Sequence, residues 1–163
     1  MTTALFIGRF QPLHKGHLSA IEQAMEDCDM LTIGIGSAQK NGHENPFSFE
    51  ERKKMIELSV SGNCKIFPLE DMDNNNLWVE QIEKVCGKFD IAYTGNPIVK
   101  KLLSEAGHKV LPVKIFPCAS ATEIREIMAD GNPEWKKFVP KSVVEFIEEI
   151  GGLERVKMLL KKN

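Results

Sequence analysis

Residues 3–27, TALFIGRFQPLHKGHLSAIEQAMED, decide the fold. The stretch opens with an apolar run at residues 3–7, which is typical of a buried β-strand, and ends with a helical pattern of apolar residues at residues 16–27. A turn that contains Gly8 joins the two. This strand, turn and helix order predicts the first half of a βαβ unit, whose strand belongs to a parallel sheet.

The same alternation continues along the chain. Further strand patterns lie at residues 30–35, 64–69, 90–93 and 109–113, and further helical patterns at residues 49–60, 77–85 and 97–105. Ser48 and Glu51 form a capping box at the start of one of these helices. We therefore expect an α/β, Rossmann-like, doubly wound parallel sheet of about five strands with helices on both faces.

After the last expected strand the pattern is helical. Helices are predicted at residues 120–129, 140–150 and 153–161, with a short turn at residues 133–138. We thus expect a helical C-terminal region over about residues 120–163. The length of 163 residues favours a single domain, residues 1–163.

Composition limits the classes of partner. The chain is 42% hydrophobic and 27% charged with a net charge of -2, so nothing attracts it globally to nucleic acid or to acidic membranes. We expect neither as a partner. No signal-peptide pattern or long apolar run occurs, and the four cysteines contain no C-x-x-C pair. We therefore expect a cytoplasmic protein with reduced thiols.

The motif GRFQPLHKGH, residues 8–17, carries the densest chemistry. Gly8 permits a sharp turn, Arg9 supplies a forked cation, and Gly16 leaves room for a phosphate near backbone N–H groups. His14 and His17 are three residues apart, so a helix that begins near residue 15 places both imidazoles on one side of its first turn. The motif predicts an anion site at a helix N-terminus.

A second motif, SATEIR at residues 120–125, opens the helix after the last strand. Ser120 and Glu123 fit a capping box, and in isolation that explanation is as good as any other. Thr122 and Arg125 add a hydroxyl and a guanidinium to a helix N-terminus that already attracts anions. Together with the histidine motif, SATEIR is interpreted as a second phosphate-binding element.

Other phosphate and hydrolase signatures are missing from the sequence. It contains no G-x-x-x-x-G-K-[ST], no G-x-S-x-G and no H-E-x-x-H. GIGSAQ, residues 34–39, only partly matches a dinucleotide fingerprint, and it follows the second predicted strand.

The two motifs resemble the H-x-G-H and S-x-T-x-x-R signatures of the nucleotidyltransferase superfamily. With GIGSAQ, NPFSFEER, NNNLW, FDIAYTGNP and VPKSVVEFIEEIGGLERVK, the chain resembles the archaeal-type nicotinamide-nucleotide adenylyltransferases over nearly its whole length. The resemblance implies transfer of AMP from ATP to nicotinamide mononucleotide (NMN), giving NAD and pyrophosphate, with Mg²⁺. It also implies a homo-oligomer, possibly a hexamer.

The resemblance implies residue roles as well. It makes His14, His17 and Arg125 catalytic, with His17 bonding the α-phosphate and Arg125 the β- and γ-phosphates. It places these residues at ATP: Gly8, Arg9, Phe10, Gln11, His14, Gly16, His17, Asn96, Ser120, Thr122 and Arg125. It places Asp71, Asn75 and Trp78 at NMN or NAD. No residue is expected to ligate a metal, because Mg²⁺ would be held through the ATP phosphates.

The residues fit this chemistry without the resemblance. A phosphate monoester is mostly dianionic at pH 7, so as a nucleophile it needs no general base. It needs donors and cations while charge builds on the leaving pyrophosphate, and Arg9, His14, Lys15, His17 and Arg125 are of that type.

The acceptor side is more open. An indole face is a good partner for a cationic pyridinium, yet a Trp near a helix start, such as Trp78, is more often part of a core. The NNN run could equally be a polar turn. Two loops depart from the family pattern, since residues 40–47 are about one residue shorter and residues 114–119 are short and lack basic residues. The alternatives are a sister transferase for nicotinic acid mononucleotide or phosphopantetheine, and a nucleotide sensor without turnover.

Overall fold

The computed structural model describes residues 1–114 and 116–161. Its contacts divide the chain into two compact units. The sheet unit comprises Met1–Arg9, Ala20–Ala38 and Gly62–Ile115, and the helical unit comprises Phe10–Ser19, Gln39–Ser61 and Phe116–Asn163. Each unit is described by itself.

The sheet unit holds five parallel strands, in the order β3-β2-β1-β4-β5. Their bounds are β1 Thr3–Gly8, β2 Met30–Ile35, β3 Cys64–Pro68, β4 Ile91–Tyr93 and β5 Val110–Leu111. Residues 4–7 of the central strand β1 are all buried, as expected of a parallel strand covered on both faces. The strand order reverses between β1 and β4, and ligands of such sheets bind beyond the carboxyl ends at that point. The predicted α/β class is confirmed.

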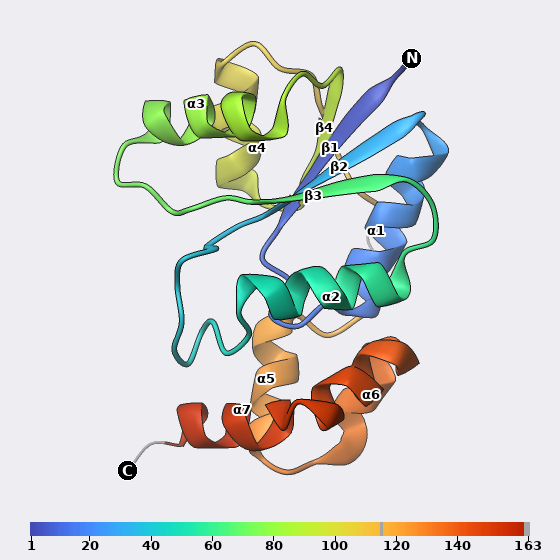
Figure 1. Cartoon of the computed structure of the whole chain (residues 1–163), viewed down its shortest axis with the longest axis vertical. Coiled ribbons are helices and arrows are strands. Elements are labelled where there is room, and N and C mark those ends of the chain that lie inside the picture. The colour runs from blue at the N-terminus through green and yellow to red at the C-terminus, as the bar shows by residue number, and fades with distance from the viewer. Residues whose placement is uncertain (115, 162–163) are drawn as a thin grey trace. The chain divides into compact units, whose positions relative to one another are not determined.

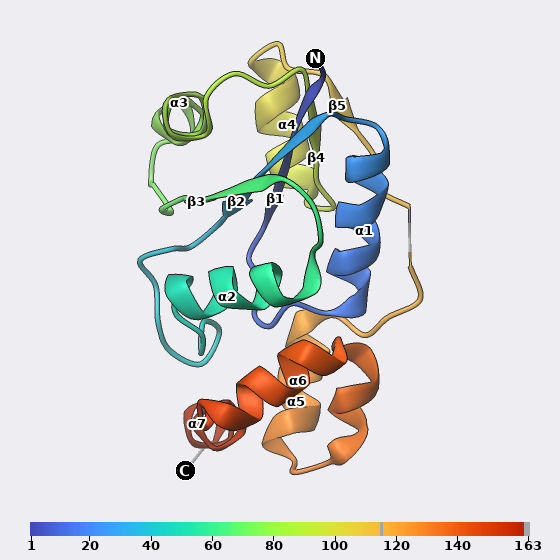
Figure 2. The same ribbon diagram turned by 45° about the vertical axis from the view of Figure 1, so that its right-hand side comes forward.

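Helices cover both faces of this sheet. Figures 1 and 2 show α3 (Asn75–Cys86) and α4 (Pro97–Glu105) on one face, and the part of α1 (Lys15–Glu26) that belongs to the sheet unit on the other. Side chains of the sheet, α3 and α4 form a buried cluster of Leu5, Ile7, Leu69, Ile82, Cys86, Ala92 and Leu103.

Two predicted boundaries shift. Helix α3 begins two residues earlier than the apolar pattern predicts, because the Asn74 side chain accepts hydrogen bonds from the N–H groups of Asn76 and Leu77, at 2.9 and 3.1 Å. Strand β5 is shorter than the predicted residues 109–113. It pairs with β4, which itself spans only three residues, so little ladder is available.

The helical unit contains α2 (Phe49–Ser59), α5 (Ala121–Ala129), α6 (Lys141–Glu149), α7 (Gly152–Leu160) and a short 3₁₀ helix, η1 (Pro133–Phe138). Helix α5 packs against α7 and η1, and α2 packs against α6. Trp135 of η1 is buried, in line with the packing role that its context favours. The predicted helical C-terminal region is confirmed for the described residues, whereas residues 162–163 lie outside them.

The search for membrane-spanning helices gives a negative result. Among residues 1–114 and 116–161, no helix has the length and apolar character needed to cross a bilayer. All four cysteines are free thiols.

Candidate active site

His14 and His17 bond to each other in a reciprocal way at the start of α1. The backbone N–H of His14 donates to Nδ1 of His17, and the backbone N–H of His17 donates to Nδ1 of His14, at 3.2 Å each. The ring centroids lie 3.6 Å apart, with 21° between the ring planes. Helix α1 begins at Lys15, so the spacing argument correctly predicts adjacent rings. Because each Nδ1 accepts a hydrogen bond, a neutral ring carries its proton on Nε2.

Gly16 and Phe10 shape the surroundings of this pair. A Cβ atom at Gly16 would lie 2.9 Å from Cε1 and 3.0 Å from Nδ1 of His14, so the glycine makes room for the stacked ring. The ring of the buried Phe10 lies 4.8 Å from that of His17. The sequence argument assigns Gly16 to phosphate approach, but the ring of His14 is the nearest group that needs the space.

Both imidazoles are held in the neutral state. Burial lowers the pKa of His14 from 6.5 to about 4. Burial, followed by repulsion from His14, holds the pKa of His17 well below its usual value. At neutral pH the pair therefore offers Nε2–H donors without a positive charge.

The SATEIR motif is bonded to the histidine loop within the helical unit. Ser120 caps α5 and forms a capping box with Glu123. Arg125, which is only 5% exposed, donates from Nη1 to the carbonyl oxygen of Gln11 at 2.7 Å and from Nη2 to Oγ1 of Thr122 at 3.3 Å. A guanidinium keeps its charge at any physiological pH. The two motifs thus form one phosphate cluster, defined as His14, His17, Thr122 and Arg125.

Gln11 is the link inside this arrangement. Its buried side chain donates from Nε2 to the carbonyl oxygen of Phe47 at 2.9 Å and accepts from the backbone N–H of Phe47 at 3.0 Å. Both ends of the amide are therefore bonded to the segment that precedes α2. The resemblance implies a place for Gln11 at ATP, and nothing in the sequence signals the partner at residue 47.

Cys118 is a neighbour of His14 that the sequence does not indicate. Its Sγ lies 3.8 Å from Nδ1 of His14 and 3.8 Å from the carbonyl oxygen of Phe138. The residue belongs to segment 114–119, which departs from the family pattern and of which residue 115 lies outside the described residues.

The predicted ATP residues of the sheet unit lie at its carboxyl-end loops. The carbonyl oxygen of Gly8 accepts from the N–H of Gly36 at 2.9 Å, and Arg9, next along the chain, is exposed. Asn96 follows β4 and caps α4, accepting from the N–H groups of residues 98 and 99 at 2.9 and 3.4 Å. Gly8, Arg9 and Asn96 thus follow the two strands between which the order reverses.

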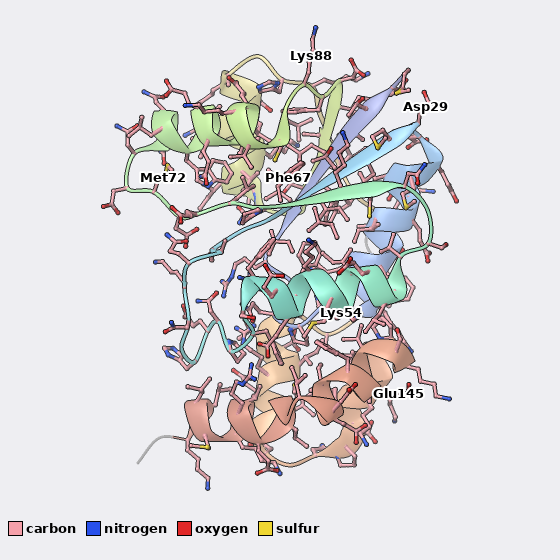
Figure 3. The ribbon with its side chains drawn as sticks, viewed as in Figure 1. Asp29, Lys54, Phe67, Met72, Lys88 and Glu145 are labelled. Carbon is pink, nitrogen blue, oxygen red and sulfur yellow. The ribbon has the colours of Figure 1, made fainter. Side chains whose placement is uncertain are left out.

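The predicted acceptor residues lie between β3 and the first turn of α3, in the segment where Figure 3 labels Met72. Asp71 accepts a hydrogen bond from the hydroxyl of Ser37 at 2.8 Å. Asn75 is exposed in the first turn of α3, and Trp78 is half-buried against the core cluster of the sheet unit. Packing therefore explains part of the Trp78 side chain and leaves part of it accessible.

The chemistry of the described side chains suits a metal only together with a phosphate ligand. Within residues 1–114 and 116–161, no three or more His, Cys, Asp or Glu side chains gather in a way that could hold an ion. Imidazole N–H and guanidinium groups bind phosphate oxygens, whereas Mg²⁺ takes oxygen ligands. The phosphate cluster can thus bind a polyphosphate, which would itself supply oxygens to a divalent cation.

Comparison with known proteins agrees with this geometry. The profile of the cytidylyltransferase-like family matches residues 5–127. The nicotinamide-nucleotide adenylyltransferase of Pyrococcus furiosus is 44% identical over 169 aligned positions, covering 98% of this chain and 89% of that protein. The protein of the same name from Archaeoglobus fulgidus is 42% identical, covering 94% of this chain and 95% of that protein.

Solved structures add a more distant relative. A bifunctional NMN adenylyltransferase/ADP ribose pyrophosphatase from Francisella tularensis, complexed with AMP and a manganese ion, superposes with a TM-score of 0.73 at 26% identity. The match covers 98% of this chain and 52% of that one, so this chain spans about half the length of the bifunctional enzyme. The chain belongs to the cytidylyltransferase-like family and, within it, to the archaeal nicotinamide-nucleotide adenylyltransferases.

Proposed function

We propose that this enzyme transfers AMP from ATP to NMN, giving NAD and pyrophosphate. The observation that carries the proposal is the reciprocal bonding of His14 and His17, which leaves two neutral Nε2–H donors side by side in a loop bonded to Arg125. The activity named for relatives that are 42–44% identical supports NMN as the acceptor. The family profile includes residues of both units, which supports a single nucleotidyltransferase domain over residues 1–163.

In the proposed reaction, an oxygen of the NMN phosphate attacks the α-phosphorus of ATP. The new P–O bond forms as the bond to the β-phosphate oxygen breaks, and pyrophosphate leaves with the electron pair. The nucleophile is already ionised, so no side chain has to remove a proton. Catalysis then depends on stabilising the charge that accumulates on the transferring and leaving groups.

His14 and His17 meet this need at the α-phosphate. Their Nε2–H groups donate hydrogen bonds to its oxygens, and His17 is assigned the one that strengthens as phosphorus becomes five-coordinate. The reciprocal Nδ1 bonds hold both rings before substrate arrives, so little reorganisation is needed during the reaction. Phe10 and Gly16 serve this pair by packing and by making space.

Arg125 is assigned to the β- and γ-phosphates, with Thr122, Ser120 and the N-terminus of α5 as further donors. Its bond to the Gln11 carbonyl fixes the guanidinium in place before ATP binds. Gln11 therefore contributes to the ATP site through its backbone and through its bonds to Phe47.

The remaining ATP residues lie in the sheet unit. Gly8 and Arg9 are assigned to the phosphate side, where Arg9 adds a cation. Asn96 is assigned to the adenosine side. All three are at carboxyl-end loops of the sheet, where ligands of this fold class bind.

Asp71, Asn75 and Trp78 are assigned to the nicotinamide riboside of NMN. The nicotinamide of NMN is a cationic pyridinium, and contact with an indole face is worth roughly 0.5 to 2 kcal/mol. The partial exposure of Trp78 and the exposure of Asn75 are consistent with this contact.

Mg²⁺ is the proposed cofactor, and it would neutralise part of the triphosphate charge while bound to phosphate oxygens. The manganese ion in the Francisella tularensis structure supports a divalent cation. A homo-oligomer, possibly a hexamer, is proposed as well, and light scattering on the purified protein tests it.

One assay tests the proposed function most directly. ATP and Mg²⁺ are incubated with the enzyme and one of NMN, nicotinic acid mononucleotide or phosphopantetheine, and pyrophosphate and the adenylylated product are both measured. Pyrophosphate and NAD should form in equal amounts with NMN. Turnover with only another acceptor would reassign the substrate, and no turnover with any acceptor would indicate a nucleotide sensor.

A further inference from the structure

Ser37, directly after β2, has an unusual backbone conformation. Its φ is +51°, in the left-handed region that residues other than glycine rarely occupy. Such a conformation costs free energy and persists only where the surrounding structure fixes it. The residue is also nearly buried, at 7% exposure.

Hydrogen bonds on either side of Ser37 hold it in this conformation. The N–H of Gly36 donates to the carbonyl oxygen of Gly8 at the end of β1, and the N–H of Ala38 donates to the carbonyl oxygen of Leu69 after β3, both at 2.9 Å. The turn thus bonds to the ends of both neighbouring strands. Its backbone path is fixed regardless of the side chain at position 37.

The path itself would be served better by glycine. Glycine adopts positive φ without steric cost, and this part of the chain already uses glycine at positions 34 and 36. A serine at this position therefore adds a hydroxyl at the expense of backbone strain. The relevant question is what the hydroxyl does.

The hydroxyl of Ser37 donates to Oδ2 of Asp71 at 2.8 Å. Asp71 is exposed and lies on the loop between β3 and α3, where a lone carboxylate would sample several rotamers. A hydrogen bond to a carboxylate is stronger than one between neutral groups, so it can hold the side chain in one rotamer. Ser37 is itself held rigidly, and it passes that order to the loop.

We propose that Ser37 is a positioning residue for the acceptor nucleotide, because it fixes the Asp71 carboxylate in the rotamer that binds NMN. This inference rests on the proposed function, which assigns Asp71 to NMN. Ser37 acts through Asp71, and its contribution is to affinity for the acceptor, leaving the ATP phosphates and the bond-breaking step unaffected.

The decisive variant is Ser37→Gly, which removes the hydroxyl and also relieves the backbone strain. Loss of one such hydrogen bond should raise KM for NMN about fivefold to tenfold, with kcat and KM for ATP within about twofold of wild type. The melting temperature should stay the same or rise, which separates positioning from a general loss of stability. Ser37→Ala removes the hydroxyl but keeps the strain, and it should raise KM for NMN by the same factor.

Ala38→Gly is the matched control, because it adds backbone freedom to the same turn without removing a hydroxyl. Its KM for NMN should match that of wild type. In an Asp71→Ala background, Ser37→Gly should give no further rise in KM, since the two residues act as a unit.

The outcomes separate the two proposals. If wild-type enzyme makes no NAD from NMN, the proposed function fails and this inference with it. If wild type is active and Ser37→Gly leaves KM for NMN within about twofold, only the inference is overturned. The same rise in KM with and without Asp71 also overturns it.

Discussion

Helices α2 and α5 of the helical unit begin with the same device. Ser48 accepts from the N–H of Glu51 at 3.1 Å, and the Glu51 carboxylate accepts from the N–H of Ser48 at 2.9 Å. Ser120 and Glu123 repeat this pattern at 3.1 and 3.2 Å. In sequence and in local geometry the two capping boxes are nearly interchangeable.

The arginine near each box is what differs. At α2, Arg155 of α7 donates to both carboxylate oxygens of Glu51, at 2.6 and 3.0 Å, and to the carbonyl oxygen of Pro46. At α5, Arg125 does not bond to the box but to Thr122 and to the carbonyl oxygen of Gln11 in the histidine loop. The same local device therefore fastens one helix to its neighbours, whereas at the other it stands beside phosphate-binding groups.

The comparison is sharpest if the chemistry next to α5 is removed directly. His17→Ala takes away a donor that the proposed mechanism uses in the transition state, so kcat should fall about 10²- to 10³-fold. Steady-state kinetics with NMN and ATP measures the effect. His108, which stacks on Phe89 and bonds Glu83 in the sheet unit, is a matched histidine outside the phosphate cluster.

His108→Ala should leave kcat within about twofold of wild type. Equal losses in kcat for His17→Ala and His108→Ala would mean that His17 matters only for folding. An unchanged kcat in His17→Ala would remove His17 from the mechanism.

Replacing the two arginines should separate the roles of the two helix starts. Arg125→Ala removes a charge-assisted bond to triphosphate, so kcat/KM for ATP should fall about 10- to 100-fold. Arg155→Ala breaks a half-exposed ion pair and should cost only about 1 kcal/mol of unfolding free energy, with kcat/KM for ATP unchanged. Kinetics and denaturant unfolding on both variants supply the data.

Arg125→Ala also leaves the Gln11 carbonyl without this donor, so it may not be read from stability alone. Arg125→Lys keeps the charge without the planar fork and should still lower kcat/KM for ATP. If both Arg125 variants lose stability but keep kcat/KM for ATP, Arg125 is a structural residue like Arg155.

Local signals made most of the fold predictable. Apolar periodicity locates the strands and helices, and both capping boxes can be read from Ser and Glu three residues apart. The adjacency of His14 and His17 follows from helical spacing alone. Errors arise at ends, as at α3, where the cap is Asn74 and the apolar pattern begins later.

The contacts that join the site could not be predicted, because they are long-range and several use backbone atoms. Arg125 and Gln11 are 114 residues apart, and the acceptor of that bond is a carbonyl oxygen that every residue possesses. Cys118 and His14 are 104 residues apart. Ser37 meets Asp71 only because neighbouring strands end at the same edge of the sheet.

Removing the cap serine should reveal a smaller difference between the helices. Ser48→Ala and Ser120→Ala should each lower the free energy of unfolding by about 1 kcal/mol. Only Ser120→Ala should also raise KM for ATP, by about twofold to threefold, because the N-terminus of α5 is the one assigned to phosphate. A rise in KM for ATP in Ser48→Ala would contradict this division of roles.

The smallest difference is expected in acid. Burial opposes ionisation of Glu51, but hydrogen bonds from Arg155 and Ser48 hold the pKa of its carboxyl below the usual 4.5. The stability that this carboxylate contributes is therefore present above about pH 4.5 and is lost as pH falls through the lower, folded pKa. Glu51→Gln should flatten the fall in melting temperature between about pH 5 and pH 3.

Glu123→Gln is the matched control for that experiment. Hydrogen bonds from Ser120 lower the pKa of Glu123 as well, but this carboxylate is exposed and solvent screens its interactions, so the flattening should be weaker. His14 adds an acid loss of its own, because its folded pKa of about 4 lies below the ordinary 6.5 and the unfolded state takes up protons first. That loss is the same in both variants and cancels between them. Equal flattening in both would show that Arg155 adds nothing to the α2 box.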